Sequence, residues 1–599
     1  MPFQISPGVS VTETDLTLIV PSIATTPAAL CGAFKWGPAN EPTFITSEKY
    51  LIEVFGTPDR DTEYARYWFT AQNFLEYGNN LRIVRVLQTG ENTATSVGTG
   101  ITNVVATGAG VYNDNSYLTN YATHAGQGPW CARYAGAKGN SLKVVVLDVN
   151  TNPNLTDTAA SDEYSDFLNY FNDVPGTSVW ANSITNSTSI NDEIHILVID
   201  AGGVFTGVAG TVLEKFAFVS KAKNSKNADG RSNYYADVIN STSVYIRWLA
   251  HPSVSSPHVG GKEWGTDLTF GDGTYLIING RINGKSVVFG GGANANLVGV
   301  DLNNLEGDCA QAYETFFLSG EEIDVSLLIA GPMRAAHAQK VIQTAEDRKD
   351  CVAFVSPTNS LGGTYAHDMS SFNLVDALAY RDDLLLSSSY GVMDSGYKLQ
   401  YDSYNDRYLY IPLNGDVAGC CVRTDLNKDP WFSPAGFDRG RIKNVVRLAY
   451  NPGKADRDEL YKKSINPVVS FPGEGVVLFG DKTLLSRPSA FDRINVRRLF
   501  IVLEKAISTA SKFLLFEFND TFTRNQFKQL VEPYLREISG RRGIQDFRVV
   551  CDETNNTPYV IDSNGFVGDI FVKPNRSINF IQLNFVATPT GISFTEVGG

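Results

Sequence analysis

Long hydrophobic runs are missing from this chain of 599 residues. No apolar stretch approaches the roughly 18 to 20 residues that a helix needs to span a bilayer, and the longest, such as 326–330, have the length of a strand. The N-terminal sequence MPFQISPGVSVTETD also lacks the basic and apolar segments of a secretory signal. We therefore expect the chain to be synthesised in the cytoplasm and not to insert into a membrane.

Cysteine is scarce and irregularly spaced. The seven cysteines stand at positions 31, 131, 309, 351, 420, 421 and 551, and no two of them form a CxxC pair. An odd, dispersed set argues against a disulfide framework. A redox switch at the adjacent Cys420 and Cys421 is the alternative, but a bridge between neighbours is strained. We expect reduced, buried cysteines.

Positive charge is also in deficit. Lys and Arg number 50 against 64 Asp and Glu, so the net charge is -14, the wrong sign for a protein that coats nucleic acid. The hydrophobic share of 43% and charged share of 19% are those of globular proteins and exclude wholesale disorder, collagen and coiled coil. At about 150 residues per domain, the length favours several domains.

Sequence motifs for catalysis and metal binding are absent. The chain has no P-loop, GxSxG or HExxH run, and its six histidines show no metal-ligand spacing. The stretch 225–230 lacks the first Asp and the final Glu of a calcium loop, so we interpret it as a turn. Adjacent carboxylates such as Asp382 and Asp383 are typical of solvated element ends, although a glycosidase could draw two carboxylates from distant positions. We expect no catalytic residue, no cofactor and no metal.

Helical and strand patterns alternate along most of the chain. Apolar spacing predicts helices at 64–77 and 334–348 and gives 211–220 helical potential. Apolar runs predict strands at the following positions: 81–87, 143–149, 193–200 and 325–330. The fold class expected is α+β and multidomain, with a C-terminal mixed α/β domain carrying assembly strands and a more β-rich outer region.

Shifts in composition suggest the domain boundaries. Residues 88–130 are rich in Gly, Thr, Asn and Ser, which is typical of a small inserted module with exposed loops. We expect these units: an extended arm at 1–22, a middle or outer domain at 23–87 plus 131–310, a peripheral module at 88–130, a central α/β domain at 311–490, and an inner C-terminal domain with a terminal arm at 491–599.

The C-terminal segment 491–599 has the clearest patterns. An apolar stripe at helical spacing consists of Val496, Leu499, Phe500, Leu503, Ile507 and Ala510. Thr523 and Gln526 suggest a capping box for a second helix, which Pro533 should kink or end. Strands are expected at 547–551 and 570–572. Toward the end, Ile581, Leu583 and Phe585 alternate with polar residues, as in a strand with one apolar face.

A basic group begins the first of these helices. Arg493, Arg497 and Arg498 lie within six residues, in a segment whose 13 basic and 12 acidic residues give a net charge of +1. Guanidinium groups placed in this way bind an acidic protein surface or phosphate. The alternative is that they form salt bridges within the helix and between domains.

Several motifs together resemble one protein family. They include SPGV (6–9), WGP (36–38), FGTP (55–58), NFLEYGNNLRIVRV (73–86), QYDSYNDRYLYIPLNGDVAG (400–419), WFSPAGFDRGRI (431–442), FDRINVRRLF (491–500), VVCDETNNTP (549–558) and RSINFIQLNFVAT (576–588). In order and density these motifs resemble the major tail sheath protein of contractile-tailed, T-even-like bacteriophages. The resemblance covers about 1–87 and most of 131–599, whereas 88–130 departs from the family, in which a larger outer domain occupies this place.

The resemblance implies a structural protein that is not an enzyme. Its expected function is to form stacked six-subunit rings around an inner tail tube and to contract, driving the tube through the host envelope for genome delivery. The implied partners are other copies of the chain, the tube protein, the baseplate and the neck or tail terminator, without direct nucleic acid contact. The implied location is the virion tail, assembled in the bacterial cytoplasm.

In such sheaths, N-terminal and C-terminal arms of neighbouring subunits add strands to a sheet in another subunit's C-terminal domain. The residues expected to serve as arm or acceptor strands here are Val9, Val11, Ile581, Leu583 and Phe585. A sheet formed within one chain is the alternative. The resemblance also makes the group Arg493, Arg497 and Arg498 either tube-facing or domain-packing.

Three other functions are weighed against this one. The sheath of a phage-derived injection particle, such as a tailocin or secretion-type system, shares the C-terminal architecture. A hydrolase that degrades the envelope needs a clustered acid and nucleophile. A receptor-binding protein is suggested only by the segment 88–130.

Overall fold

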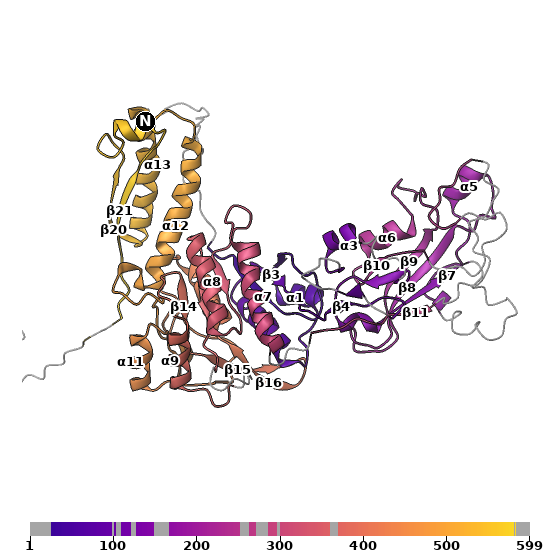
Figure 1. Cartoon of the computed structure of the whole chain (residues 1–599), viewed down its shortest axis with the longest axis horizontal. Helices are drawn as coiled ribbons and strands as arrows, with labels where there is room; N and C mark the ends of the chain where they lie inside the picture. Colours follow the sequence, from indigo (N-terminus) through magenta and orange to yellow (C-terminus); the bar gives the residue numbers. More distant parts are fainter. Residues whose placement is uncertain are drawn as a thin grey trace, which may run out of the picture.

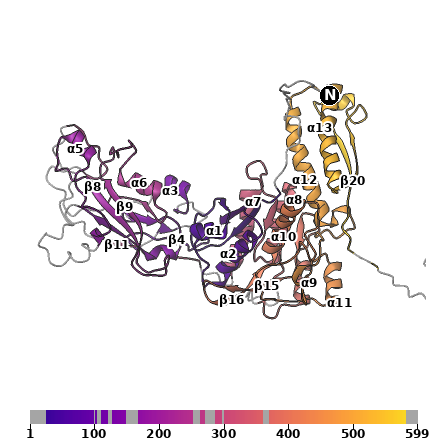
Figure 2. The ribbon, with the colours of Figure 1, turned by 180° about the vertical axis from the view of Figure 1, so that it is seen from behind.

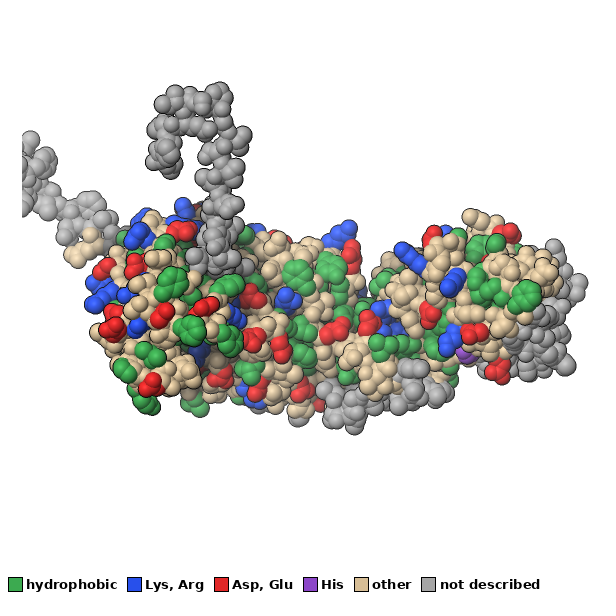
Figure 3. Space-filling view, turned by 90° about the horizontal axis from the view of Figure 1, so that it is seen from above, with side chains coloured by type: hydrophobic (Ala, Val, Ile, Leu, Met, Phe, Trp, Pro, Cys, Tyr) green, Lys and Arg blue, Asp and Glu red, His purple; other side chains and the backbone are tan. Residues whose placement is uncertain are grey.

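The computed structural model describes residues 25–98, 101–102, 110–120, 127–148, 167–251, 263–270, 286–295, 300–359, 369–579 and 582. These residues form an elongated molecule with three lobes along its long axis (Figure 1). We call them the outer lobe (88–295), the central lobe (25–87 with 300–493) and the C-terminal lobe (494–579). Figure 3 shows the elongated outline from above, with hydrophobic, basic and acidic side chains interspersed on that face.

A six-stranded sheet forms the centre of the central lobe. Its strands are β1 (Ala28–Gly32), β2 (Thr43–Ile45), β3 (Leu81–Arg85), β12 (Leu327–Ile329), β13 (Val352–Val355) and β14 (Gly391–Met393). They lie in the order β14-β13-β12-β1-β3-β2, and all neighbours are parallel except β2 with β3. β1, with the sequence AALCG, is buried throughout, as expected for a parallel strand covered on both faces.

Helices cover both faces of this sheet, some directly and some through a neighbouring helix. They are α1 (Glu48–Phe55), α2 (Thr62–Leu75), α7 (Val300–Phe317), α8 (Ala335–Arg348), α9 (Leu374–Asp383), α10 (Asn414–Asn427) and α11 (Lys454–Lys462). The units β1-α2-β3 and β12-α8-β13 progress in opposite directions from the centre, and right-handed crossovers therefore put α2 and α8 on opposite faces. α7 packs with α8, in front of the sheet in Figure 1, and α10 packs with α2, in front in Figure 2.

Smaller antiparallel units complete the central lobe. β15 (Tyr397–Asp402) lies between β16 (Arg407–Pro412) and β17 (Arg447–Leu448), while β18 (Val468–Phe471) pairs with β19 (Gly475–Leu478). All seven cysteines of the chain are buried and form no disulfide in the structure, which confirms that they are core residues. Within the described parts of the chain, no helix is long and apolar enough to cross a membrane.

The outer lobe contains an antiparallel sheet in the order β11-β7-β8-β9. These strands are β7 (Leu142–Leu147), β8 (Glu193–Asp200), β9 (Thr211–Ser220) and β11 (Ser286–Val288). The helical potential of 211–220 was therefore misleading, because this segment is a strand. β8 is buried along seven of its eight residues and pairs with β9 along its length, and this tertiary pairing outweighs the local helical pattern.

Shorter elements surround this sheet. They are β4 (Asn92–Thr93), β5 (Ile101–Thr102), α3 (Asp114–Asn120), β6 (Trp130–Ala132), α5 (Val179–Thr185), α6 (Tyr235–Thr242) and β10 (Ile246–Trp248). β6 pairs with β10 and β4 with β5. Trp130 and Ala94 belong to the same buried cluster as Val144 and Ile196 of the sheet.

Two expected domain groupings differ from the structure. The segment 23–87 was grouped with 131–310, but its strands β1, β2 and β3 lie in one sheet with β12, β13 and β14. Described parts of 88–130 are not a separate module either, because Thr95 forms bridges with both Cys131 and Gly290. Strand pairing between distant segments decides both groupings, and local composition does not reveal it.

The C-terminal lobe consists of two long helices and a two-stranded sheet (Figure 1). The helices are α12 (Ile494–Ser511) and α13 (Thr521–Gly540), and the strands are β20 (Ile544–Val550) and β21 (Asp569–Pro574). The short helix α14 (Pro558–Asp562) comes between the two strands in the chain. Val496, Leu499, Leu503 and Ala510 are buried, and Phe500 and Ile507 are half-buried, so the predicted stripe is confirmed.

Two details of α13 differ from expectation. Its N-cap is Asp520, whose carboxylate accepts the Thr523 backbone N–H at 2.8 Å, so the proposed capping box at Thr523 is wrong. The helix also continues through Pro533 to Gly540. Leu530 and Leu535 on either side of the proline are buried in the core of the lobe, and this packing outweighs the hydrogen bond that proline removes.

Candidate assembly surface

The sheet formed by β20 and β21 has one buried and one exposed face. Ile544 and Val549 are buried against α12 and α13, and Ile570 and Val572 are partly buried beside them. On the opposite face, Arg548 lies directly across from Phe571, whose exposed fraction is 59%. The strand predicted for 570–572 is thus present, with one side of β21 on the core and the other in solvent.

Both long edges of this sheet are candidate sites for added strands. Within the described residues the sheet contains only β20 and β21, so each strand has a neighbour on one side alone. An unpaired strand edge offers its backbone N–H and C=O groups to another chain. A two-stranded sheet that already has one face packed on helices is therefore a ready template for added strands.

The chain leaves β21 along the surface of the central lobe. The hydroxyl of Ser577 donates to Asp481 Oδ2 at 2.7 Å, and the amide of Asn579 donates to Asp481 Oδ1 at 3.1 Å and to the Tyr461 hydroxyl at 2.7 Å. These bonds hold the beginning of the C-terminal segment against the central lobe. The predicted arm residues Val9, Val11, Ile581, Leu583 and Phe585 lie outside the described residues.

The three arginines of the predicted basic group lie at the joint between the C-terminal and central lobes. Arg493 Nη1 is 3.1 Å from Asp481 Oδ1. Arg497 is buried and donates to the Ser389 hydroxyl at 2.8 Å, with its guanidinium over the Phe491 and Tyr390 rings. Arg497 and Arg498 thus form packing contacts between the two lobes, whereas Arg493 pairs with Asp481 inside the central lobe. A contact of this group with an inner tube stays a prediction.

Arg85 holds the opposite joint, between the central and outer lobes. Its side chain is fully buried, and its Nη2 lies 3.0 Å from Glu91 Oε2. The same guanidinium donates to the carbonyl oxygens of Gly37 at 2.8 Å and of Ala135 at 3.0 Å. One charged side chain thus ties β3 to three separate segments. Sequence reasoning missed it, although an arginine between the apolar residues Val84 and Val86 was an available signal.

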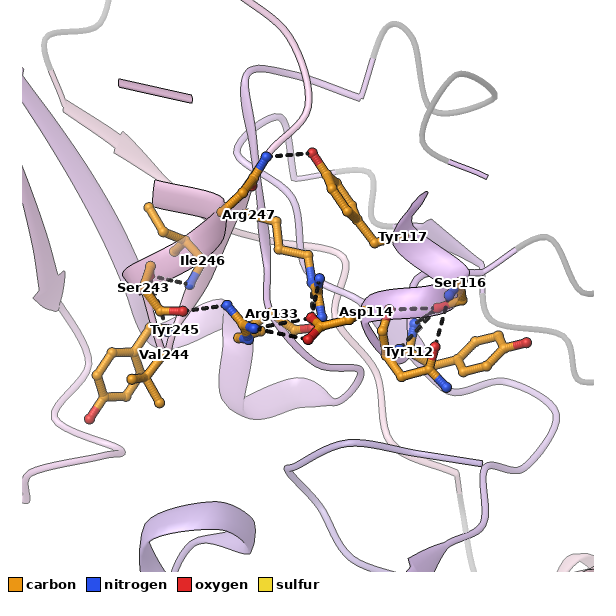
Figure 4. Close-up of polar contacts among 12 residues, drawn as sticks. Tyr112, Asp114, Ser116, Tyr117, Arg133, Ser243, Val244, Tyr245, Ile246 and Arg247 are labelled. Atoms are coloured by element: carbon orange, nitrogen blue, oxygen red, sulfur yellow. Dashed lines mark hydrogen bonds and ion pairs between the residues drawn. The ribbon is translucent and has the colours of Figure 1, made fainter. Parts of the chain in front are cut away.

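Trp36 and Asp114 reinforce this joint. Trp36 inserts into the core of the outer lobe, where its ring meets those of Tyr134 and Phe205 edge to face. Figure 4 shows Asp114 between two arginines, with Oδ1 at 3.0 Å from Arg133 Nη2 and 2.6 Å from Arg247 Nη1. α3 is therefore fastened to β10 and to the residue that follows β6.

The carboxylate of Glu41 interacts with the same charged side chains. Burial raises the pKa of Glu41 above its ordinary value, and the nearby Asp114 raises it further, while Arg247 and Arg133 lower it. In the parts of the chain that the structure describes, no three His, Cys, Asp or Glu side chains gather as a metal would require.

Comparison with known proteins identifies the family. Residues 486–588 match the phage tail sheath C-terminal domain, 316–484 match the phage tail sheath protein central domain, and 25–86 match the domain III N-terminal region of tail sheath protein Gp18. The tail sheath protein of Vibrio phage KVP40 is 35% identical over 680 aligned positions, which cover 99% of this chain and 100% of that protein. The chain belongs to the phage tail sheath family.

A second phage relative agrees with this assignment. The tail sheath protein of Enterobacteria phage T4 is 33% identical over 660 positions, covering 99% of both chains. A crystal structure of a sheath tail protein from Listeria innocua is 10% identical with a TM-score of 0.49, over 93% of this chain and 96% of that one. As a tail sheath protein, the chain is a structural component of the virion, as the sequence motifs predicted.

The regions matched by the family correspond to parts of the fold. The separately matched regions 25–86 and 316–484 contribute strands to one central sheet of this sheath protein. The intervening outer lobe, 88–295, lies outside the three matched regions. The outer lobe is therefore an insertion between two halves of the central lobe.

Proposed function

We propose that this chain is the repeating subunit of a contractile phage tail sheath, which polymerises as stacked six-subunit rings around an inner tube. The observation that carries the proposal is the two-stranded sheet of β20 and β21, whose edges face no further strand within the described residues. Its partners are other copies of the chain, the tail tube protein, the baseplate and the neck or tail terminator. It assembles in the host cytoplasm and carries out no catalysis.

Strand addition links the subunits. Residues around Val9 and Val11 from one neighbour and around Ile581, Leu583 and Phe585 from another extend the β20–β21 sheet of a third subunit. Backbone hydrogen bonds supply affinity, and the alternating apolar side chains set the register. Because such contacts are heterologous, they propagate into a helical polymer and do not close into an isolated dimer.

In this proposal, contraction is a movement of rigid subunits that stay connected through their arms. The buried joints at Arg85 and at Arg498 keep the three lobes together, so whole subunits rotate while the arms maintain the lattice. An extended lattice persists behind a kinetic barrier although the contracted lattice has lower free energy. Even about 1 kcal/mol per subunit sums to a large driving force when neighbours must switch together.

Electron microscopy of the purified protein tests this function. Negatively stained samples at several concentrations, with and without the cognate tail tube, should contain hollow cylinders with six-fold helical rows. Cylinders without the tube would represent the contracted lattice. Dispersed particles under every condition would contradict the proposal.

A further inference from the structure

A cleft of about 990 Å³ lies where the C-terminal lobe meets the central lobe. Trp431, Phe432 and Phe479 provide aromatic walls, and Gln545 and Pro574 bring the end of the β20–β21 sheet to its edge. Phe479 remains 44% exposed, so apolar surface inside the cleft is open to a partner.

Unpaired cations surround these aromatic walls. Lys454, Arg457, Arg542 and Arg576 all line the cleft, and among the residues that the structure describes no carboxylate forms an ion pair with any of them. Arg457 lies over the rings of Phe471 and Phe479, at 5.7 and 5.8 Å from their centroids. A group of cations around one cleft, without carboxylate partners, fits an anionic ligand.

The other polar groups in the cleft strengthen this interpretation. Of its two carboxylates, Asp458 is exposed, whereas Asp481 is already bound by Arg493 at 3.1 Å and by Ser577 at 2.7 Å. The side chain of Asn495 is buried, and its Oδ1 accepts no hydrogen bond from the described residues. The cleft therefore keeps an excess of positive charge, in a protein whose net charge is -14.

The direction of the strands indicates what reaches the cleft. β20 begins at the cleft and β21 ends there. A strand added antiparallel to the outer edge of β20 therefore runs toward the cleft. If that strand includes Val9 and Val11, Glu13 and Asp15 follow two and four residues later, about 7 and 13 Å farther along an extended chain.

The distribution of charged residues also favours the N-terminal segment as the one that reaches the cleft. Glu13 and Asp15 are the only charged side chains among residues 1–24, whereas residues 580–599 have Glu596 alone. Copies of a chain with a net charge of -14 repel one another. Carboxylates that enter a basic cleft on the next copy offset this repulsion where the copies meet.

We propose that the cleft between the central and C-terminal lobes binds Glu13 and Asp15 of a second copy of this chain, with Arg542 and Arg576 as their principal partners. This inference rests on the proposed assembly by strand addition. It adds to that assembly the ion pairs of Glu13 and Asp15 with Arg542 and Arg576, which we call the lock. The aromatic walls accommodate the neighbouring apolar side chains of the same segment.

Charge reversal in the full-length protein tests the lock. The double variant R542E/R576E and the double variant E13K/D15K should each need about tenfold more protein to polymerise than wild type, because two attractive pairs become repulsive. The matched control K215E/K226E changes the charge equally at exposed outer-lobe positions and should polymerise as wild type does. Circular dichroism of each variant checks that it is folded.

Combining the reversals separates contact between copies from contact within one chain. A chain carrying all four changes should polymerise near the wild-type concentration. An equimolar mixture of the two double variants should do so as well, since each arm then meets a complementary cleft on the other variant. Rescue in the combined chain but not in the mixture would overturn the assignment to a second copy.

The remaining outcomes distinguish this inference from the proposed function. Wild-type polymerisation by R542E/R576E, with wild type itself forming cylinders, would overturn the lock and leave the sheath function standing. Failure of wild type to polymerise with or without the tube would overturn the sheath function and the lock with it.

Discussion

Arg498 of α12 and Asp425 of α10 form an ion pair in which Nη2 lies 2.5 Å from Oδ2, with both side chains at most 5% exposed. The hydroxyl of Thr25 donates to the same Oδ2 at 2.5 Å. This carboxylate thus joins the C-terminal lobe, the central lobe and the start of the described chain. Such a contact holds the two lobes together.

Breaking that pair on one side should destabilise the protein strongly. Replacement of Arg498 by Met leaves the Asp425 carboxylate buried without its cation, and the free energy of unfolding should fall by about 3 to 5 kcal/mol. Urea denaturation followed by circular dichroism measures the change. The double variant R498M/D425N should recover part of the loss, and a double variant as unstable as the sum of the single ones would contradict this explanation.

A buried carboxyl group in the central lobe should make stability depend on pH. Burial raises the pKa of Asp394 from its ordinary value of 3.8 to about 8, although hydrogen bonds from Ser356 at 2.6 Å and from the Gly396 N–H at 2.8 Å lower it. Between these two values the folded chain keeps a proton that the unfolded chain releases. Stability from this group is therefore present at low pH and is lost as the pH rises from about 4 to about 8.

The variant D394N isolates this contribution. Its amide stays neutral at every pH, so wild type should lose stability relative to D394N between pH 5 and pH 8. Urea midpoints of the two proteins at several pH values give the difference. Parallel pH profiles would show that Asp394 does not titrate differently in the folded and unfolded chains.

The joint between the central and outer lobes should depend on Arg85. The variant R85M leaves Glu91 buried without its cation and removes donors to Gly37 and Ala135, at a cost of about 3 to 5 kcal/mol. Limited proteolysis should then cut between the two lobes before the cores of either are digested. Digestion of R85M at the wild-type rate and sites would count against this role.

Asp114 should contribute less, despite its two arginine partners. Its side chain is 66% exposed, and pairs that water and salt can screen are weak. The variant D114N should lower the free energy of unfolding by about 1 kcal/mol at low ionic strength, and by less in 0.5 M salt. An undiminished effect at high salt would mean that Arg247 is shielded from solvent more fully than the exposure of Asp114 suggests.

Removal of residues 580–599 should separate folding from assembly. The truncated chain keeps Ser577 and Asn579 with their bonds to Asp481, so its circular dichroism spectrum and melting temperature should stay close to those of wild type. Electron micrographs should show no cylinders, because Ile581, Leu583 and Phe585 are gone. Cylinders formed by the truncated chain would refute their assignment as arm residues, and loss of the folded spectrum would show that this segment supports the fold.

Local sequence pattern was enough to predict many elements of this protein. The apolar stripe of 494–511 recurs at the period of an α-helix, and the runs predicted as strands at 81–87 and 193–200 are mostly apolar over the length of a strand. Each pattern therefore follows from the geometry of one element. The family, too, was evident from ordered motifs. These features depend on residues close together in the chain.

Only the tertiary structure decided which segments belong together. In the structure, β1 of the region 25–86 lies beside β12, and residues 211–220 form a strand that pairs with β8. Arg497 and Arg498 are buried between lobes. It also brought Arg457, Arg542 and Arg576 to one cleft. Each of these outcomes depends on pairing and burial between residues far apart in the chain, and the free energy of such contacts is set by the surroundings that folding creates, which no local pattern encodes.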